Sequence, residues 1–403
     1  MSAATPPGGP RPPISPAPLP VTGAWRPGDP PEDRQFFTVP TEHFSLEGGG
    51  RLREVTLAYE TWGTLDADAS NAILVCHALT GDAHAAARSD RATDAPGWWL
   101  DLIGPGRPVD TNRWFVVCAN ILGGCQGTTG PASIDPATGA PYGSTFPIVS
   151  IRDIVRTQAA LADHLGIDRW HSVIGGSLGG MQVLEWAVMF PDRMRSIVPI
   201  ATCAAATAQQ IAYSTVQRFA ISLDPNWRGG DYYDAEPGEG PHRGLAVARQ
   251  LAHITYRTNQ VFEQRYGLDT SDPLDAFTLW QRFEVESYLD YQGTKLVRRF
   301  DANSYLRICK AMDLHDIGRR RPGGVDGVLG RINVPALVMS VSSDNLFWPE
   351  QQQRIVDGIR ARHSRCALVT IDSPDGHDGF LLATDQIGAA LTPFLDEVEK
   401  DHD

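Results

Sequence analysis

Closely spaced cysteine pairs are absent from this chain of 403 residues, and its six cysteines are dispersed without a C-x-x-C pair. Disulfide scaffolds and zinc sites need closer and more regular spacing. We therefore expect buried free thiols in a reducing cytoplasm, and no metal. The chain also lacks an uncharged apolar run of about 18 residues, which argues against a membrane-spanning helix. The first 35 residues have neither the charged start nor the apolar core of a secretion signal.

Positive charge is in short supply too, because 35 Lys and Arg stand against 48 Asp and Glu, giving a formal net charge of −13. Such a chain has little with which to neutralise a phosphate backbone, so nucleic acid is not an expected partner. The composition is otherwise that of a globular protein, with 42% hydrophobic residues. Residues 1–35 differ, since 11 of the 30 prolines lie before Asp33, and we predict a disordered Pro-rich tail there.

From residue 36 the pattern alternates between short apolar runs and helical periodicity. Strands are predicted at 53–59, 71–77, 114–120, 334–342 and 366–372, and helices at 151–165 and 384–399. Strand and helix in alternation predict an α/β domain with a mainly parallel central sheet flanked by helices. Residues 204–330 are helical in pattern. We interpret them as a lid inserted before the last strands of a core domain that comprises 36–203 and 331–403.

The most informative segment is Gly-Gly-Ser177-Leu-Gly-Gly, which lies between a predicted strand and a predicted helix. Glycines on both sides of Ser177 leave room for a tight, strained turn that lifts the hydroxyl above the sheet. The G-x-S-x-G pattern alone is weak in a chain with 39 glycines. Its position between strand and helix makes Ser177 the candidate nucleophile.

A serine hydroxyl needs a histidine to take its proton and a carboxylate to orient that histidine. Asp344 and His377 each follow a predicted strand, at the same edge of the sheet as Ser177, in the chain order Ser, Asp, His. We therefore predict these three as the catalytic residues. His77 and His84 are expected to have structural roles near the site.

Acyl transfer also requires donors for the oxyanion of the tetrahedral intermediate. The backbone N–H of Leu178, directly after the nucleophile, is one predicted donor. The second is predicted to come from the loop at 77–82, from Leu79. The alternative is that this loop is a plain turn that contains a glycine.

Beyond these residues, the chain resembles the homoserine O-acetyltransferases of the α/β-hydrolase superfamily. The matching segments cover the chain from about residue 36 to 395 and include 59–65, 76–82, 120–131, the Ser177 turn, 300–305 and the His377 loop. The most specific is Asn-Ile-Leu-Gly-Gly-Cys-Gln-Gly-Thr-Thr-Gly-Pro at 120–131, which general lipases and esterases do not carry. The resemblance implies an α/β-hydrolase fold with a helical lid.

The family moves an acyl group from acyl-CoA to the hydroxyl of L-homoserine in methionine biosynthesis, through a serine acyl-enzyme. The resemblance implies that Arg218 binds the homoserine carboxylate and that Asp378 holds its amino group. It also implies a homodimer formed through the lid. Acetyl-CoA would be a co-substrate, and no bound cofactor is expected.

Several alternatives remain open at this stage. Relatives that use succinyl-CoA resemble each other in an Arg shortly after the triad Asp, where this chain has Leu346, which favours acetyl over succinyl. A homoserine O-succinyltransferase or a serine O-acyltransferase would use the same triad. An esterase-type hydrolase would use it with water, and a non-catalytic relative would act as a binding module.

Overall fold

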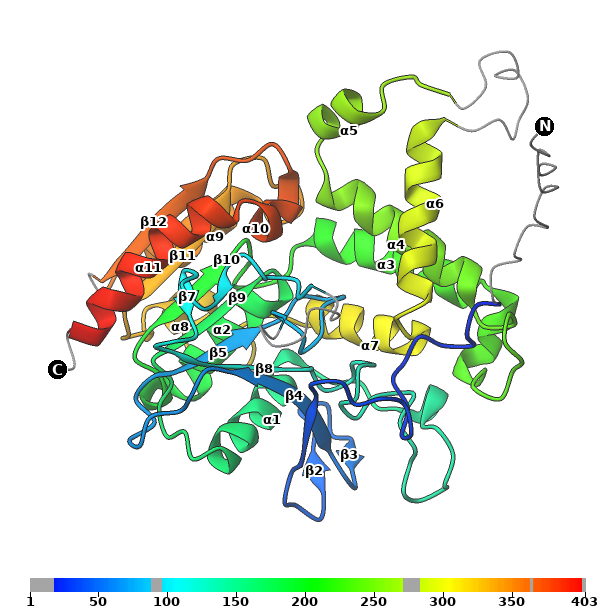
Figure 1. Ribbon diagram of the computed structural model, residues 1–403, viewed down its shortest axis with the longest axis horizontal. Coiled ribbons are helices and arrows are strands. Elements are labelled where there is room, and N and C mark those ends of the chain that lie inside the picture. The colour runs from blue at the N-terminus through cyan, green and yellow to red at the C-terminus, as the bar shows by residue number, and fades with distance from the viewer. Residues whose placement is uncertain (1–17, 88–95, 271–282, 363–364, 401–403) are drawn as a thin grey trace, which may run out of the picture.

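The computed structural model describes residues 18–87, 96–270, 283–362 and 365–400 (Figure 1). Its central element is an eight-stranded sheet with the strand order β1-β4-β8-β5-β9-β10-β11-β12. The bounds of these strands are β1 (Gln35–Thr38), β4 (Thr56–Trp62), β5 (Ala72–Cys76), β8 (Phe115–Ala119), β9 (Ser172–Gly176), β10 (Ile197–Ile200), β11 (Ala336–Val341) and β12 (Cys366–Ile371). All neighbours from β8 to β12 are parallel, whereas β4 runs antiparallel to both β1 and β8. The predicted mainly parallel sheet is confirmed.

Helices cover both faces of the sheet. One face packs against α1 (Ile151–His164), α2 (Leu178–Met189) and α9 (Pro349–Arg360), and the other packs against α11 (Thr384–Lys400). Strands such as β5 and β9 are buried at every position because both faces are covered. Two short pairs, β2 (Phe44–Ser45) with β3 (Arg51–Leu52) and β6 (Ile103–Gly104) with β7 (Val109–Asp110), were not predicted, because two residues are too few to show periodicity.

The region between β10 and β11 is helical. It contains α3 (Ala208–Ser222), α4 (His242–Tyr256), α5 (Asn259–Arg265), α6 (Glu284–Val297), α7 (Ala302–Asp313) and α8 (Gly324–Leu329). Figure 1 shows α3, α4 and α6 crossing one another beside the sheet, and α4 packs against both α3 and α6. This helical region (residues 204–330) begins directly beyond the carboxyl end of β10, so it stands over the edge of the sheet where ligands bind in open α/β folds.

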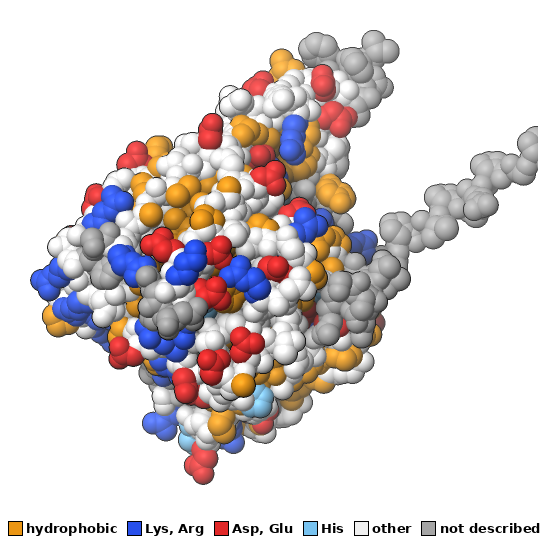
Figure 2. All heavy atoms as spheres, turned by 60° about the vertical axis from the view of Figure 1, so that its left-hand side comes forward, with side chains coloured by type: hydrophobic (Ala, Val, Ile, Leu, Met, Phe, Trp, Pro, Cys, Tyr) orange, Lys and Arg blue, Asp and Glu red, His pale blue; other side chains and the backbone are white. Residues whose placement is uncertain are grey.

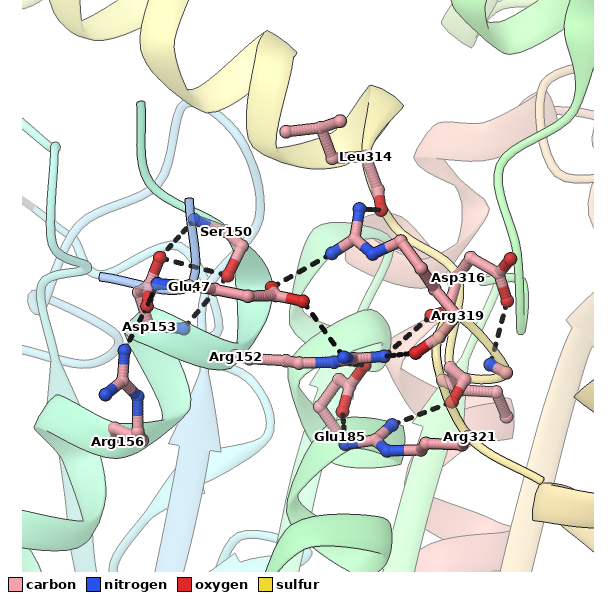
Figure 3. A network of polar contacts seen from close by, with 12 residues as sticks. Glu47, Ser150, Arg152, Asp153, Arg156, Glu185, Leu314, Asp316, Arg319 and Arg321 are labelled. Atoms are coloured by element: carbon pink, nitrogen blue, oxygen red, sulfur yellow. Dashed lines mark hydrogen bonds and ion pairs between the residues drawn. The ribbon is translucent and has the colours of Figure 1, made fainter. Parts of the chain in front are cut away.

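A buried ion-pair network fastens the end of the helical region to the core (Figure 3). Arg152 of α1 donates from Nε to Glu185 of α2 at 3.0 Å and from Nη1 to Glu47 at 2.9 Å. Its Nη2 donates to two backbone carbonyls in the segment that follows α7. Arg321 pairs with the second oxygen of Glu185 at 2.8 Å. Because Glu185 lies on α2, the network joins the helix that follows Ser177 to the helical region.

The prediction of a disordered tail at 1–35 is wrong for residues 18–35, while residues 1–17 lie outside the described residues. The Thr22 hydroxyl donates to Asp301 at 2.8 Å, and the Trp25 amide donates to the Cys125 carbonyl at 2.9 Å. Gly23 packs so closely against the backbone at Phe300 that a Cβ on residue 23 would lie 2.3 Å from the Phe300 nitrogen. The prolines disfavour helices and strands in this segment. Its backbone N–H and C=O groups are instead satisfied by hydrogen bonds to other segments, and these contacts order the chain without regular secondary structure.

The surface and the cysteines match the composition. On the face that Figure 2 shows, acidic and basic side chains are interspersed rather than separated by sign. Within the described ranges, the helices are too short or too polar to cross a bilayer. All six cysteines are free and buried, as predicted, and burial raises the pKa of the Cys309 thiol to about 12.

Candidate active site

Ser177 occupies a strained turn between β9 and α2. Its backbone has φ 58° and ψ −124°, a conformation that costs free energy in a residue with a Cβ and is found at functional sites. Close packing explains the glycines that follow it. A Cβ on Gly179 would lie 2.1 Å from the Cys76 carbonyl oxygen, and one on Gly180 would lie 2.5 Å from the Thr202 Cβ. Because Gly179 has no side chain, the first turn of α2 can pack against the end of β5, and the Ser177 hydroxyl lies at the end of β9.

His377 joins Ser177 to Asp344. The His377 Nε2 lies 2.8 Å from the Ser177 Oγ, and its Nδ1 lies 2.7 Å from the Asp344 Oδ2. The other oxygen of Asp344 accepts the backbone N–H groups of Leu346 and Phe347, each at 2.8 Å. All three side chains are buried. The carboxylate is thus fixed in direction, and it fixes the imidazole so that Nε2 faces the hydroxyl.

Aromatic rings surround the His377 imidazole. Phe347 stacks on it with ring centroids 4.9 Å apart, and Phe380 and Tyr256 lie at 5.2 and 5.8 Å. Tyr256 comes from the end of α4, so the helical region supplies part of this enclosure. Burial raises the pKa of Tyr256 to about 12, which keeps its phenol protonated at neutral pH.

The two predicted oxyanion donors lie in the segments that directly follow β9 and β5. Leu178 is the first residue of α2, where a backbone N–H has no acceptor within the helix. Leu79 follows β5 in the loop at 77–82 and lines the same pocket as Phe347. The His77 Nδ1 lies 2.8 Å from the Ala78 carbonyl oxygen, and its Nε2 accepts from the Ile121 amide at 3.1 Å. Such bonding fits a neutral ring, in agreement with burial lowering the pKa of His77.

A chain of side-chain amides holds this loop in place. Gln182 donates to the His77 carbonyl at 3.1 Å, Gln158 donates to Gln182 at 2.7 Å, and Trp186 donates to Gln158 at 2.8 Å. All of these groups are buried. His84 pairs with the buried Glu60 at 2.9 Å. The structural roles predicted for His77 and His84 agree with these contacts.

A pocket lies between the core and the helical region, and two of its lining residues, Phe347 and Tyr256, also contact the His377 ring. It is lined from the core by Leu79, Met181, Leu346 and Phe347, and from the helical region by Tyr213, Gln217, Tyr256, Met312 and Asp313, among others. Leu346 and the neighbouring Phe347 make the wall of the pocket apolar on the side of the core. Within the described ranges, no cluster of three or more metal-ligating side chains is found.

Arg218 and Asp378 both have charged partners. The Arg218 guanidinium pairs with Asp313 and also donates to Ser214 at 2.6 Å. Asp378 follows His377 directly, and its Oδ2 lies 3.0 Å from the Arg257 Nε. The structure thus pairs Asp378 with an arginine of the helical region and pairs Arg218 with Asp313, which lines the pocket.

Arg249 is the charged residue that the sequence analysis missed. Its guanidinium lies 5.7 Å from the centre of the Tyr256 ring and donates to the Thr80 hydroxyl at 3.3 Å, next to Leu79. Its buried Nε has no hydrogen-bond partner. The spacing of seven residues between Arg249 and Tyr256 puts both on one face of α4, which is the only signal the sequence offers. That signal does not distinguish a ligand-facing arginine from a solvated one.

The strand order, the strained turn and the Asp344–His377–Ser177 hydrogen bonds together define an α/β-hydrolase-fold protein. In agreement, the family model described as the alpha/beta hydrolase fold matches residues 71–384. A curated homoserine O-acetyltransferase of Moorella thermoacetica is 52% identical over 356 residues, which cover 88% of this chain and 94% of that protein.

Two solved structures are close in shape. Homoserine O-acetyltransferase from Bacillus anthracis matches with a TM-score of 0.83 and 28% identity, covering 90% of this chain and 97% of that one. Esterase E22 matches with a TM-score of 0.82 and 30% identity, covering 90% and 99%. Within the α/β-hydrolase fold, this chain belongs to the homoserine O-acetyltransferase family.

Proposed function

We propose that this protein transfers the acetyl group of acetyl-CoA to the hydroxyl of L-homoserine, a step of methionine biosynthesis, through an acetyl-Ser177 intermediate. The observation that carries the proposal is the continuous hydrogen bonding from Asp344 through His377 to Ser177, beside a pocket that residues of the core and of the helical region line together. The name and 52% identity of the Moorella relative support the choice of substrates. Residues 204–330 act in this proposal as the lid of the core 36–203 and 331–403.

The first half-reaction acylates the enzyme. His377 Nε2 takes the proton of the Ser177 hydroxyl, whose oxygen attacks the thioester carbon. The N–H groups of Leu178 and Leu79 stabilise the oxyanion. The carbon–sulfur bond then breaks, and the CoA sulfur leaves with the proton from His377.

The second half-reaction regenerates the serine. His377, held by Asp344, takes the proton of the homoserine hydroxyl, and that oxygen attacks the acetyl carbon. The bond to Ser177 Oγ breaks, and His377 returns the proton to Oγ. The enclosure of the imidazole by Phe347 and Tyr256 favours the bound alcohol over water as the attacking group.

Charged groups around the pocket fit a zwitterionic acceptor. We propose that Asp378 receives the ammonium of homoserine and that Arg249 binds its carboxylate. The unpartnered buried Nε of Arg249 supports this choice over Arg218, which already pairs with Asp313. A guanidinium with an unused N–H suits a carboxylate.

The pocket favours acetyl over succinyl as the transferred group. Leu346 lines it at the position where a cation would be needed, and the lining carboxylate of Asp313 is already neutralised by Arg218. A second carboxylate buried there would lack a partner, at a cost of several kcal/mol by the estimate for unpaired buried charges.

We further propose a homodimer formed through the lid and a cytoplasmic location. Val216 and Phe219 on α3 and Leu223, which caps the helix, are 57%, 61% and 80% exposed, and their spacing of three and four residues puts them on one face. A second copy of this chain would cover such a stripe. The six buried thiols suit a reducing compartment.

The decisive experiment measures CoA release with acetyl-CoA or succinyl-CoA as donor, and with L-homoserine, L-serine or water as acceptor. We expect rapid turnover for acetyl-CoA with L-homoserine alone. Ser177→Ala should lower it by about 10⁴-fold or more while the fold remains intact by circular dichroism. Turnover in water equal to that with L-homoserine would instead identify an esterase, the function that esterase E22 represents.

A further inference from the structure

The end of α4 is joined to the loop that carries His377. Arg257, the residue after α4, donates from Nη1 to Asp375 Oδ1 at 2.7 Å, and its Nε lies 3.0 Å from Asp378 Oδ2. The Arg257 and Asp378 side chains are only 12% and 14% exposed. One guanidinium from the helical region thus bridges the two carboxylates that flank the catalytic loop, with a separate nitrogen for each.

Contacts that do not involve Arg257 also hold the two segments together. The Thr258 hydroxyl donates to the Pro374 carbonyl at 2.7 Å. Gly376 has φ +66°, and a Cβ there would lie 2.4 Å from the Tyr256 carbonyl oxygen. On its other side, the Gly376 amide donates to the Ser343 hydroxyl at 2.9 Å. The peptide that precedes His377 is therefore clamped between the core and the lid without help from Arg257.

Because these other contacts already hold the His377 loop, the Arg257 side chain is not needed for that purpose, and its contact with Asp378 calls for a separate explanation. Its contact with Asp378 uses Oδ2, which leaves Oδ1 to accept an N–H from a bound molecule. A carboxylate held in a partly buried ion pair loses little rotational freedom when it binds a second cation. Without Arg257, the Asp378 side chain would lose the contact that fixes its direction.

We propose that Arg257 is a positioning residue that aims the Asp378 carboxylate at the ammonium of the acceptor, and that it thereby sets the selectivity for amino alcohols. The inference rests on the proposed acetyl transfer and deepens it. Arg257 touches neither the acyl group nor the attacking hydroxyl, so it acts on the acceptor half-reaction through Asp378.

The test compares two acceptors that differ only in the ammonium group, L-homoserine and 4-hydroxybutanoate. We expect Arg257→Gln to lower the ratio of their kcat/KM values about tenfold, the size of effect of one charge-assisted contact. Asp378→Asn should lower the same ratio, and the double variant should show the ratio of Asp378→Asn alone. Arg257→Lys, which keeps the charge, should recover part of the loss.

Thr258→Val is the matched control, because it removes the bonds of the Thr258 hydroxyl to the Pro374 carbonyl and to the Val261 amide at the start of α5, and leaves the Asp378 contact in place. Its acceptor ratio should stay within about twofold of the parent. A parallel loss with both acceptors in Arg257→Gln, together with slower acetylation of Ser177 by mass spectrometry, would show a merely structural role and overturn the inference. An unchanged ratio would overturn it as well. If the parent itself fails to acetylate L-homoserine, the proposed function fails instead.

Discussion

Two arginines of the helical region, Arg218 and Arg249, are candidates for binding the carboxylate of the proposed acceptor. Arg218 is neutralised by Asp313, so a substrate carboxylate would have to displace a buried partner. Arg249 already contacts Thr80 and Tyr256 and keeps a buried N–H without an acceptor. An unsatisfied buried donor costs free energy in the free protein, and a bound carboxylate removes that cost.

We expect Arg249→Ala to raise KM for L-homoserine on the order of 10- to 100-fold, because one charge-assisted contact is lost. Acetylation of Ser177 by acetyl-CoA should change far less, since no acceptor takes part. Arg218→Ala is the comparison variant, and steady-state kinetics with a single-turnover acetylation assay measure both steps. If Arg218→Ala raised KM more than Arg249→Ala does, Arg218 and not Arg249 would be the residue that binds the carboxylate.

At the scale of elements, α2 has two neighbours that fix it from opposite ends. Its first turn rests against β5 through Gly179, and its later turns carry Glu185 into the network of Figure 3. Arg152 is the centre of that network, with its side chain only 13% exposed. Removing a partner from a buried ion pair leaves the remaining charge without compensation.

Arg152→Met should therefore lower the free energy of unfolding by about 3–5 kcal/mol, the range for breaking a buried pair. The matched control is Arg354→Met, which removes an exposed pair with Asp326 and should cost about 0–1 kcal/mol. Urea unfolding followed by circular dichroism measures both. Equal midpoints for the two variants would contradict the assignment of a stabilising role to the network.

At the scale of the whole molecule, the lid shows hydrophobic side chains outward as well as inward. α4 also has exposed apolar side chains, since Val247 and Ile254 are about half exposed and seven residues apart. α3 and α4 pack against each other, so these side chains belong to neighbouring helices of the same region. An apolar surface of this kind marks an interface between proteins more often than a solvated face.

We expect the parent to sediment as a dimer and Phe219→Glu to shift it to monomer at micromolar concentration, because a charge would be buried in the interface. Ile134→Glu, which changes a residue of similar exposure outside the lid, should leave the dimer intact. Analytical ultracentrifugation distinguishes the states. A parent that sediments as a monomer would contradict the proposal.

The residues that form the hydrogen-bonded relay could be predicted because their signals are local. Ser177 lies in a glycine pattern, and Asp344 and His377 each follow a recognisable buried strand; parallel strands bring their ends to one edge. Arg218 and Arg249 could not be told apart in this way. Both are arginines on amphipathic helices, and only the packing of α3 and α7 shows that Arg218 meets Asp313.

The sequence by itself determined the alternation of strands and helices, the turn at Ser177 and the chain order of the relay, because each depends on residues close in the chain. The tertiary structure decided which charges meet. It placed Arg257 against Asp375 and Asp378, more than a hundred residues later, and it bonded Gly23 to Phe300 and Trp25 to Cys125. Such contacts depend on how elements pack in space, and neither composition nor periodicity records that packing.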